Sequence, residues 1–398
     1  MLVAIKNDKK RVYMKNNKLE VIRELINNLK ESALYAMSLS SMELFHTNFW
    51  QWLMRFDNRY VSIFFDDINV KSINKKNIRR EYKNTDISIE YDNKLYIIEN
   101  KMKSLPNREQ LEKYSNNNSF IKGVYIFPFY HESFNEICNN WNFKSYNEII
   151  ENICEITKKI EINEKNNSNI VIIKEYINMT KTLIKLFENV IDYIGNNYIN
   201  FINNKELIYL LKEIRIDDII LKINGHLISI ELLKRLKEKF NDEELKKIKI
   251  QNSYNNGSST ISARWNLLYN DFENGYFLIG PQLEKDGFRT MIHITTESFG
   301  IKNIKTERQG VLDSLYESIE KDVFGEINYE YPRTSRKYDK YRAIFDNKQY
   351  IAMYKYNQIK DSSFEYICDL FINELDRLKN INSKNLYTRI KEGLAMYN

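Results

Sequence analysis

The spacing of hydrophobic and polar residues changes along this chain, and the change separates predicted strands from predicted helices. Residues 85–91 alternate and are β-branched, and residues 94–102 are rich in Ile, Leu and Tyr, so both are predicted strands. Asp92 and Asn93 stand between them, and both residue types tolerate the positive φ of a two-residue hairpin turn. Residues 120–127 are largely apolar, which is typical of a strand buried on both faces.

Apolar residues at helical spacing predict helices on either side of this hairpin. The predicted helices are 18–36, a helix that starts at Ser40 or Ser41, 107–117 opened by Pro106 and Asn107, 132–160 and 168–193. The polar segment 74–83 leads into the hairpin and is expected to be a loop with a first short strand. Residues 40–127 are therefore predicted to run in the order helix, three strands, helix, strand.

The second half of the chain also alternates between the two periods. Helices are expected near 204–215, 227–247, 308–323 and from 363, and strands around 248–254, 259–269, 275–280, 288–296 and 341–355. This pattern predicts an α+β domain without a recognisable catalytic signature. The polar, aperiodic segment 195–204 marks the boundary, which divides the chain into residues 1–198 and 199–398.

Composition sets broad limits on function. The 398 residues suffice for two domains, and the net charge of +6 is compatible with a polyanionic partner, although the abundance of Lys and Asn is also expected from an AT-rich genome. Three cysteines and four dispersed histidines, without metal-ligand spacing, argue against a zinc site. No apolar run is long enough for a signal peptide or a membrane span, so we expect a soluble, cytoplasmic protein without a membrane partner.

The predicted hairpin places two acids opposite each other. If Asp92 and Asn93 form the turn, Tyr91 pairs with Lys94 and Asp86 faces Glu99 across the two strands. Like charges directly opposite destabilise a hairpin unless something neutralises them, and a divalent cation would do so.

Because side chains alternate along a strand, the charged candidates are expected on one face of the hairpin and the apolar core residues on the other. Lys101 shares the face of Asp86 and Glu99, whereas Ile87, Ile89, Tyr96 and Ile98 are expected on the opposite, core face. Two carboxylates and a backbone carbonyl such as that of Asn100 are ligands suited to Mg²⁺ or Mn²⁺. A lysine beside such an ion can orient bound water or offset charge on a phosphorus centre.

Asp86, twelve intervening residues and then Glu99-Asn100-Lys101 resemble the motif of the PD-(D/E)XK nuclease superfamily, with Thr85 in place of the family's proline. Gln110-Leu-Glu-Lys-Tyr114 resembles the Gln-xxx-Tyr motif of nuclease domains in bacterial recombination helicase-nucleases. Glu43-Leu-Phe-His46 resembles the superfamily's helical glutamate. With Trp141-Asn-Phe-Lys-Ser-Tyr146, the spacing is most similar to an uncharacterised bacterial branch of the superfamily, and the resemblance covers roughly residues 38–185.

The resemblance implies an α/β fold with a restriction-endonuclease-like αβββαβ core and added helices, followed here by the separate α+β C-terminal domain. It implies a Mg²⁺-dependent (or Mn²⁺-dependent) nuclease that cleaves DNA, with RNA not excluded, and a homo-oligomer is compatible with it. Asp86 and Glu99, with the Asn100 carbonyl, would hold the metal, Lys101 would position the attacking water, and Gln110 would orient water or substrate. A role in defence against foreign DNA would give the C-terminal domain a part in specificity, sensing or oligomerisation. The alternative is a catalytically inert protein with the nuclease fold that binds nucleic acid or has a regulatory role.

Several residues allow two interpretations. Glu43 is either a capping-box partner of Ser40 or a ligand of metal-bound water or a second ion, and Gln110 is either a helix cap or a residue that faces the metal with Tyr114. Arg79 and Arg80, in a stretch with five basic residues, form either a charged sheet edge or phosphate contacts.

Two further stretches complete the candidates. Arg336 and Lys337 belong to a run that interleaves five basic residues with two tyrosines, which suits either a charged loop or contact with phosphates and bases. The Glu-x-Lys pattern recurs at Glu244-Leu-Lys246 within a predicted helix, where we expect a solvated face.

Overall fold

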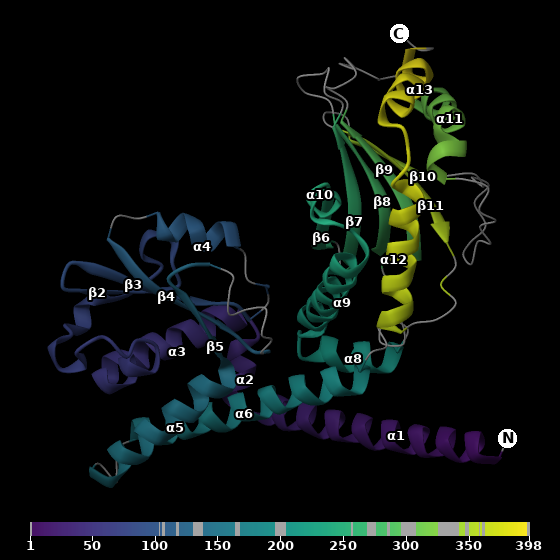
Figure 1. Cartoon of the computed structure of the whole chain (residues 1–398). Helices are drawn as coiled ribbons and strands as arrows, with labels where there is room; N and C mark the ends of the chain where they lie inside the picture. Colours follow the sequence, from purple (N-terminus) through teal and green to yellow (C-terminus); the bar gives the residue numbers. More distant parts are fainter. Residues whose placement is uncertain are drawn as a thin grey trace. The chain divides into compact units, whose positions relative to one another are not determined.

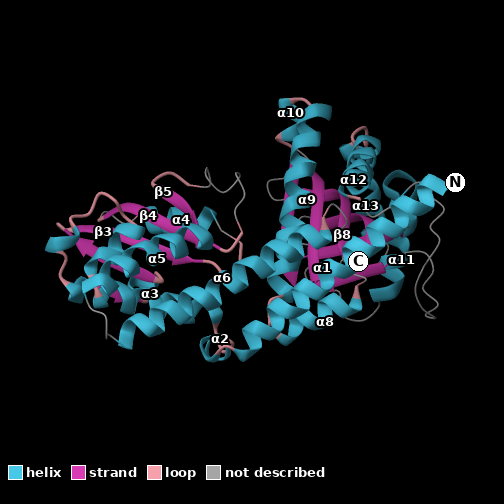
Figure 2. Cartoon of the chain, turned by 90° about the horizontal axis from the view of Figure 1, so that it is seen from below, coloured by secondary structure: helices cyan, strands magenta, loops and turns pink. Residues whose placement is uncertain are grey.

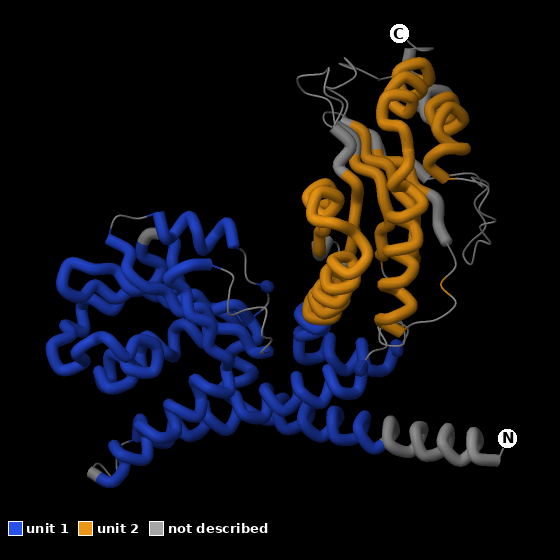
Figure 3. Tube along the Cα trace, viewed as in Figure 1, with its two compact units in different colours: residues 1–195, 204–220 blue, residues 196–203, 221–398 orange. Residues whose placement is uncertain are grey.

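A computed structural model gives the fold of the chain. It describes residues 2–102, 104–105, 108–116, 119–129, 138–163, 168–195, 204–255, 258–268, 276–284, 287–295, 308–324, 342–346, 350–357, 359 and 363–395. The chain forms two compact units, one with residues 1–195 and 204–220 and the other with residues 196–203 and 221–398 (Figure 3). The predicted boundary at 198/199 falls outside the described residues, and the two units divide at 220/221, within helix α9 (Asp217–Lys239).

The first unit contains a five-stranded mixed sheet with the order β1-β2-β3-β4-β5 (Figure 1). Its strands are β1 (Ile78–Arg80), β2 (Ile87–Tyr91), β3 (Lys94–Asn100), β4 (Phe120–Phe127) and β5 (Trp141–Ser145). The first three strands are antiparallel, and β3, β4 and β5 are parallel. Helix α3 (Met42–Phe56) precedes β1, and helix α4 (Arg108–Ser115) connects β3 to β4. Residues 42–127 thus follow the predicted order of helix, three strands, helix and strand.

The β2–β3 hairpin has the register predicted from the sequence. Asp92 and Asn93 have φ angles of 50° and 60°, and Tyr91 pairs with Lys94. Two successive residues with positive φ form a turn whose twist matches that of the strands. Ile87 pairs with Ile98, so the hydrophobic face of the hairpin is fixed by its turn.

Both faces of the sheet are covered. Ile87, Ile89 and Ile98 are fully buried on the face that α3 covers, as predicted. The opposite face is also apolar, because Leu95 and Ile97 are 2% and 1% exposed. Glu99 belongs to this second face, so it lies in a largely dry environment.

The prediction of one helix over residues 132–160 was wrong in its first part. Residues 141–145 form β5, which pairs with β4 in parallel, and helix α5 (Tyr146–Asn163) begins directly after it; residues 130–137 lie outside the described residues. The Trp141 ring lies over Gly123, where a Cβ atom would clash with it. Pairing with β4 and the contact between Trp141 and Gly123 cause residues 141–145 to form a strand rather than a helix. Neither interaction can be recognised from the local spacing of apolar residues.

The N-terminal helix predicted at 18–36 is interrupted. Helix α1 (Leu2–Glu31) ends before Ser32, whose side chain accepts a hydrogen bond from Tyr35 N and so caps helix α2 (Ala33–Ser38). Helix α6 (Ser168–Ile194) was predicted almost to its ends. Helix α8 (Lys205–Glu213) packs on α1 through an ion pair between Lys30 and Glu213 at 3.0 Å. This contact assigns α8 to the first unit.

The second unit contains a six-stranded, fully antiparallel sheet with the order β10-β11-β9-β8-β7-β6 (Figure 1). Its elements are α10 (Asp242–Leu245), β6 (Ile248–Asn255), β7 (Ser258–Leu268), β8 (Tyr276–Glu284), β9 (Gly287–Thr295), α11 (Arg308–Ile319), a π-helical turn (Glu320–Phe324), β10 (Arg342–Asp346), β11 (Tyr350–Asn357), α12 (Phe364–Leu378) and α13 (Ser383–Ala395). Figure 2 shows strands of this sheet, including β8, in magenta beside the helices α9 and α12. The sequence predicted the order of these elements, but the helix expected at 227–247 is α9, which spans Asp217–Lys239, and the closing helix expected from 363 is divided into α12 and α13.

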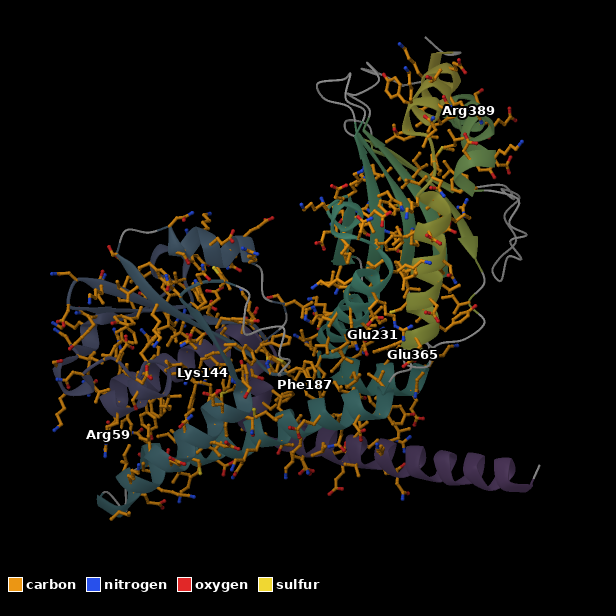
Figure 4. All side chains as sticks on the ribbon, viewed as in Figure 1. Arg59, Lys144, Phe187, Glu231, Glu365 and Arg389 are labelled. Atoms are coloured by element: carbon orange, nitrogen blue, oxygen red, sulfur yellow. The ribbon has the colours of Figure 1, made fainter. Side chains whose placement is uncertain are left out.

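One face of the second sheet packs against helices to form a core. Trp265 of β7 donates a hydrogen bond from Nε1 to the Leu375 carbonyl of α12 at 2.8 Å. Arg235 of α9 forms ion pairs with Glu231, labelled in Figure 4, and with Asp369 of α12, both at 2.8 Å. The chain is therefore a mixed α/β protein with two separate sheets.

None of the helices in its described part combines the length and apolarity needed to cross a membrane.

Candidate active site

Two acids meet where β2 begins and β3 ends. Asp86 immediately precedes β2, and its Oδ2 accepts a hydrogen bond of 2.7 Å from the backbone N–H of Asn100, the last residue of β3. Continued alternation from Ser88, which pairs with Ile97, places Asp86 on the face of Glu99. The Asp86 carboxylate thus accepts the hydrogen bond from the Asn100 N–H. If β2 were longer, a backbone carbonyl of β2 would accept this hydrogen bond instead.

Glu99 is buried, and the side chains that contact its carboxylate within the described residues reach one of its two oxygens. Its Oε1 contacts Lys101 Nζ at 2.7 Å and accepts a hydrogen bond from Gln110 Nε2 at 2.9 Å. Its Oε2 is buried and has no hydrogen-bond partner within the described part of the chain. Since buried polar atoms are almost always paired, this oxygen is an exception that calls for a ligand or a proton.

The electrostatics of the pair follow from burial and mutual repulsion. Burial and the charge of Asp86 raise the pKa of Glu99 to about 7, although Lys101 and a hydrogen bond from the Asp86 backbone oppose the shift. Burial also raises the pKa of Asp86, with the nearby Glu43 and Glu81 adding to the effect and the Asn100 N–H and Lys101 opposing it. For Lys101, the carboxylates of Glu99, Asp86 and Glu43 together outweigh burial, so its pKa is raised and it stays charged. The site therefore disfavours a second negative charge unless a cation is added.

Gln110 and Tyr114 lie on one side of α4 and face the acid pair, which agrees with the second of the two interpretations of Gln110 rather than with the helix cap. Gln110 Nε2 contacts both Glu99 Oε1 and, at 2.8 Å, the Tyr114 hydroxyl. The Tyr114 hydroxyl donates to the Asn84 carbonyl at 2.7 Å. The Gln110 amide thus donates hydrogen bonds to Glu99 and Tyr114. Asn107, which was expected to be its partner in the helix cap, lies outside the described residues.

The capping-box interpretation of Glu43 was wrong. The N-cap of α3 is Ser41, and Glu43 Oε1 accepts hydrogen bonds from Met102 N at 3.2 Å and Ser104 Oγ at 3.3 Å. Glu43 therefore holds the segment that follows Lys101. Its charge raises the pKa of Asp86, which shows that it lies near the acid pair.

Asn100 contributes more than the backbone carbonyl that was expected of it. Its buried side chain donates to the Glu43 carbonyl at 2.9 Å and accepts from the Tyr146 hydroxyl at 2.7 Å. The amide thus ties the end of β3 to α3 and α5. Sequence reasoning missed this role of Asn100 and Tyr146, because only the contact across the sheet reveals it.

His46, which lies near this network, is a core residue. Its Nδ1 is 2.7 Å from the Tyr176 hydroxyl, and burial lowers its pKa to about 3. The ring is therefore neutral at physiological pH. No metal or acid–base role follows for it.

The basic candidates are already paired or lie outside the described residues. Arg79 forms an ion pair with Glu90 at 3.0 Å and lies over the Tyr82 ring, and Arg80 contacts Glu81 at 3.4 Å. These pairs suit a charged sheet edge, and phosphate contact stays a prediction. Arg336 and Lys337 lie outside the described residues.

A pocket of about 280 Å³ adjoins the acid pair on the face that α4 covers. Leu95 and Ile97 of β3 line it from the sheet, and Gln110, Lys113 and Tyr114 line it from α4. Asn84 and Thr85, just before Asp86, also border it. Gln110 therefore belongs to both the pocket and the acid pair.

The donor set fits a divalent cation in part. The two carboxylates and the Asn100 carbonyl are hard oxygen donors, and Glu99 Oε2, which has no hydrogen-bond partner among the described residues, is a candidate ligand. However, the described residues contain no group of three or more His, Cys, Asp or Glu side chains placed to hold an ion. Asp86 and Glu99 would therefore need backbone or water oxygens to complete a coordination shell.

Comparison of the chain with protein-family models, with curated proteins and with solved structures gave no match. Its function has to be argued from the site itself.

Proposed function

We propose that this protein is a Mg²⁺-dependent or Mn²⁺-dependent nuclease that hydrolyses phosphodiester bonds in DNA. The observation that carries the proposal is the buried Glu99 Oε2 beside a second carboxylate, with no partner in the described part of the chain. A buried acid whose pKa is raised by a neighbouring acid, next to a charged lysine and a pocket, is typical of a functional site.

Asp86, Glu99 and the Asn100 carbonyl would hold the cation. When bound, the cation supplies Lewis acidity, which lowers the pKa of bound water and offsets charge on the phosphoryl oxygens. The same charge would relieve the repulsion that raises the pKa of Glu99.

The remaining residues act on water and substrate. The Lys101 ammonium, fixed on Glu99 Oε1 and kept charged, would donate a hydrogen bond to the attacking water or to a phosphate oxygen. Gln110 is tied to Glu99 and Tyr114 and would fix the orientation of Glu99. Asn100 and Glu43 hold the backbone on both sides of Lys101 through α3 and α5.

The order of elements in residues 42–127 supports assignment to a restriction-endonuclease-like core. A helix, an antiparallel three-stranded meander, a helix and a parallel strand place the acids of β2 and β3 at one end of the sheet. The net charge of +6 favours a nucleic acid as substrate, and RNA is the competing polymer.

One observation favours a second candidate, a nuclease-fold protein that binds nucleic acid without cutting it. The described residues offer two acids rather than three at the site, and Lys101 is bound to one of them. Loss of catalysis with retention of a fold is common.

One assay separates the two candidates. Purified protein is incubated with circular plasmid, linear duplex, single-stranded DNA and RNA, in Mg²⁺, in Mn²⁺ or in EDTA, beside Asp86→Asn and Lys246→Ala variants. We expect metal-dependent cleavage by the parent and by Lys246→Ala, and none by Asp86→Asn. Absence of cleavage of every substrate, together with no heat of Mg²⁺ or Mn²⁺ binding in calorimetry, would establish the inert alternative.

A further inference from the structure

One buried tyrosine reaches the end of β3 from the sheet face that α3 covers, opposite the acid pair. Tyr146 is the first residue of α5 and is fully buried, and its hydroxyl donates a hydrogen bond of 2.7 Å to Asn100 Oδ1. Its ring centroid lies 5.0 Å from that of His46, edge to face, and 5.4 Å from that of Trp50, both on α3. The position of the hydroxyl is therefore set by α3 and α5 and not by the acids.

The side chain of Asn100 is held at both of its polar atoms. Oδ1 accepts from Tyr146, and Nδ2 donates to the Glu43 carbonyl at 2.9 Å and to Thr47 Oγ1 at 3.3 Å. If the amide turned over, Oδ1 would face the Glu43 carbonyl, and two acceptors would meet in a buried site. The Tyr146 hydroxyl is the donor that Oδ1 receives, so it fixes the orientation of the amide.

The Tyr146 hydroxyl is suited to this task because it keeps its proton. Burial and the nearby Tyr176 raise its pKa well above the ordinary value, although the hydrogen bond to Asn100 opposes the shift. An ionised tyrosine could not donate to Oδ1, so the hydroxyl is a donor throughout the neutral pH range. It holds a hydrogen bond and does not transfer a proton.

The backbone of Asn100 stands at the centre of the acid pair. Its N–H donates to Asp86 Oδ2 at 2.7 Å, its carbonyl is a proposed cation ligand, and Glu99 and Lys101 are its neighbours along the chain. The N–H of Lys101 in turn donates to the Ile126 carbonyl of β4 at 2.8 Å. Because side chain and backbone share one Cα atom, a side chain fixed on one face of the sheet limits how this carbonyl can turn.

We propose that Tyr146 is a positioning residue of the cation site, which holds the Asn100 carbonyl and the adjoining Glu99 in the geometry that binds the metal. The proposal rests on the proposed function, since it concerns the cation of the same site. The Tyr146 hydroxyl bonds to Asn100 from the face opposite both acids, so it acts through Asn100 and not on water or substrate.

The chain supplies a matched control in Tyr60. This residue of the 3₁₀ helix η1 (Asn58–Ile63) is also fully buried, and its hydroxyl forms a hydrogen bond of 2.9 Å with Thr157 of α5. Thr157 lies about three helical turns, or about 16 Å, along α5 from Tyr146. Tyr60→Phe and Tyr146→Phe thus each remove one buried hydroxyl beside α5 and keep the ring, so a purely structural effect should be the same in both.

Calorimetric titration with Mn²⁺, without nucleic acid, measures the dissociation constant of the cation for the parent and both variants. We expect Tyr146→Phe to raise this constant about tenfold or more and Tyr60→Phe to leave it unchanged, because residues that orient metal ligands affect metal affinity by about 10–100-fold. Urea denaturation in EDTA should show similar losses of stability in the two variants. In plasmid cleavage, Tyr146→Phe should need more Mn²⁺ for its half-maximal rate and approach the parental rate at saturating Mn²⁺.

Thr47→Val is an independent test of the same proposal. It removes the contact of 3.3 Å between Thr47 Oγ1 and the Asn100 amide and keeps the shape of the side chain. It should raise the dissociation constant of Mn²⁺ in the same direction by a smaller factor. If Tyr146→Phe does not unfold cooperatively, Thr47→Val decides, and a constant equal to that of the parent overturns the proposal.

The outcomes separate this proposal from the nuclease proposal. Equal dissociation constants for the parent and Tyr146→Phe, or equal increases in Tyr146→Phe and Tyr60→Phe, overturn the positioning role. If the parent also cuts DNA in that case, the nuclease stands without it. If the parent binds Mn²⁺ but never cuts, and Tyr146→Phe binds it more weakly, the positioning role stands in an inert protein. A parent that binds no Mn²⁺ overturns both.

Discussion

The same Glu-x-Lys pattern occurs in both units of this protein and has opposite physical properties in each. Glu99 ends a strand of the first sheet, and burial together with Asp86 raises its pKa to about 7. Glu244 lies in the short helix α10, where its ion pair with Lys379 and its hydrogen bond from the Asn241 N–H lower its pKa. One acid resists ionisation and the other favours it.

The difference comes from what surrounds the carboxylate. Glu244 has both a cation and a backbone donor, and its side chain is partly exposed, so its charge is satisfied. Glu99 shares a dry face with another acid and has one oxygen without a partner in the described part of the chain. A Glu-x-Lys tripeptide therefore indicates catalytic chemistry only where the fold buries the glutamate without the cation and hydrogen-bond donors that neutralise a surface carboxylate.

The largest expected effect is on catalysis. Lys101→Ala should lower metal-dependent DNA cleavage by about a hundredfold or more, because it removes the cation that faces developing charge. Lys246→Ala should leave the rate unchanged. Plasmid nicking followed on gels measures both rates, and a Lys101→Ala rate equal to that of the parent would refute the assignment of Lys101.

The asparagines beside the two glutamates should differ in their effect on stability. Asn100→Ala leaves the buried Tyr146 hydroxyl without its acceptor and removes one of the two side-chain donors to the Glu43 carbonyl, which keeps the Thr47 hydroxyl, so we expect a loss of about 2 kcal/mol in the free energy of unfolding. Asn241→Ala removes the exposed N-cap of α10 and should cost about 1 kcal/mol. Urea denaturation of both variants measures the difference, and equal losses would contradict the role given to Asn100.

The acid pair should make metal-free protein less stable as pH rises. The pKa of Glu99 is about 7 in the folded state and near its ordinary value of 4.5 when unfolded, so the folded state binds more protons between these values. The free energy of unfolding should then fall as pH rises from 4.5 to 7 and level off above, by roughly 2–3 kcal/mol.

Glu99→Gln isolates this contribution. In EDTA, the variant should be less sensitive to pH and more stable than the parent above pH 7. Denaturation curves from pH 4 to 8 test this, and a parent no less stable at pH 8 than the variant would contradict the raised pKa. Added Mg²⁺ should narrow the difference by stabilising the parent.

The smallest expected effect has the opposite sign. The lowered pKa of Glu244 means that its ion pair stabilises the fold above pH 4.5 and that this contribution is lost as pH falls through the lower, folded-state value. Glu244→Gln should therefore lower the melting temperature slightly at pH 7, and parent and variant should converge in acid. Melting curves at pH 7 and pH 3 measure this, and a variant more stable than the parent at pH 7 would reverse the comparison.

The sequence by itself determined the features that depend on neighbouring residues. Asp92 and Asn93 specify the hairpin turn, and the turn with the alternation of Ile87 and Ile89 sets the register, so Asp86 could be placed opposite Glu99 without a structure. The positions of the strands in the second unit were predicted for the same reason, because alternation is a local pattern, whereas their antiparallel order was not predicted.

Only the tertiary structure decided what surrounds those residues. The strand at 141–145 exists because it pairs with β4, and α8 joins the first unit because Glu213 meets Lys30, far away in the sequence. The raised pKa of Glu99 arises from its burial and from the charge of Asp86, and its Oε2 lacks a hydrogen-bond partner among the residues that the structure describes. Desolvation and charge repulsion depend on distances between segments that a linear pattern does not contain, so the alignment of the acids could be predicted, but not their electrostatic state.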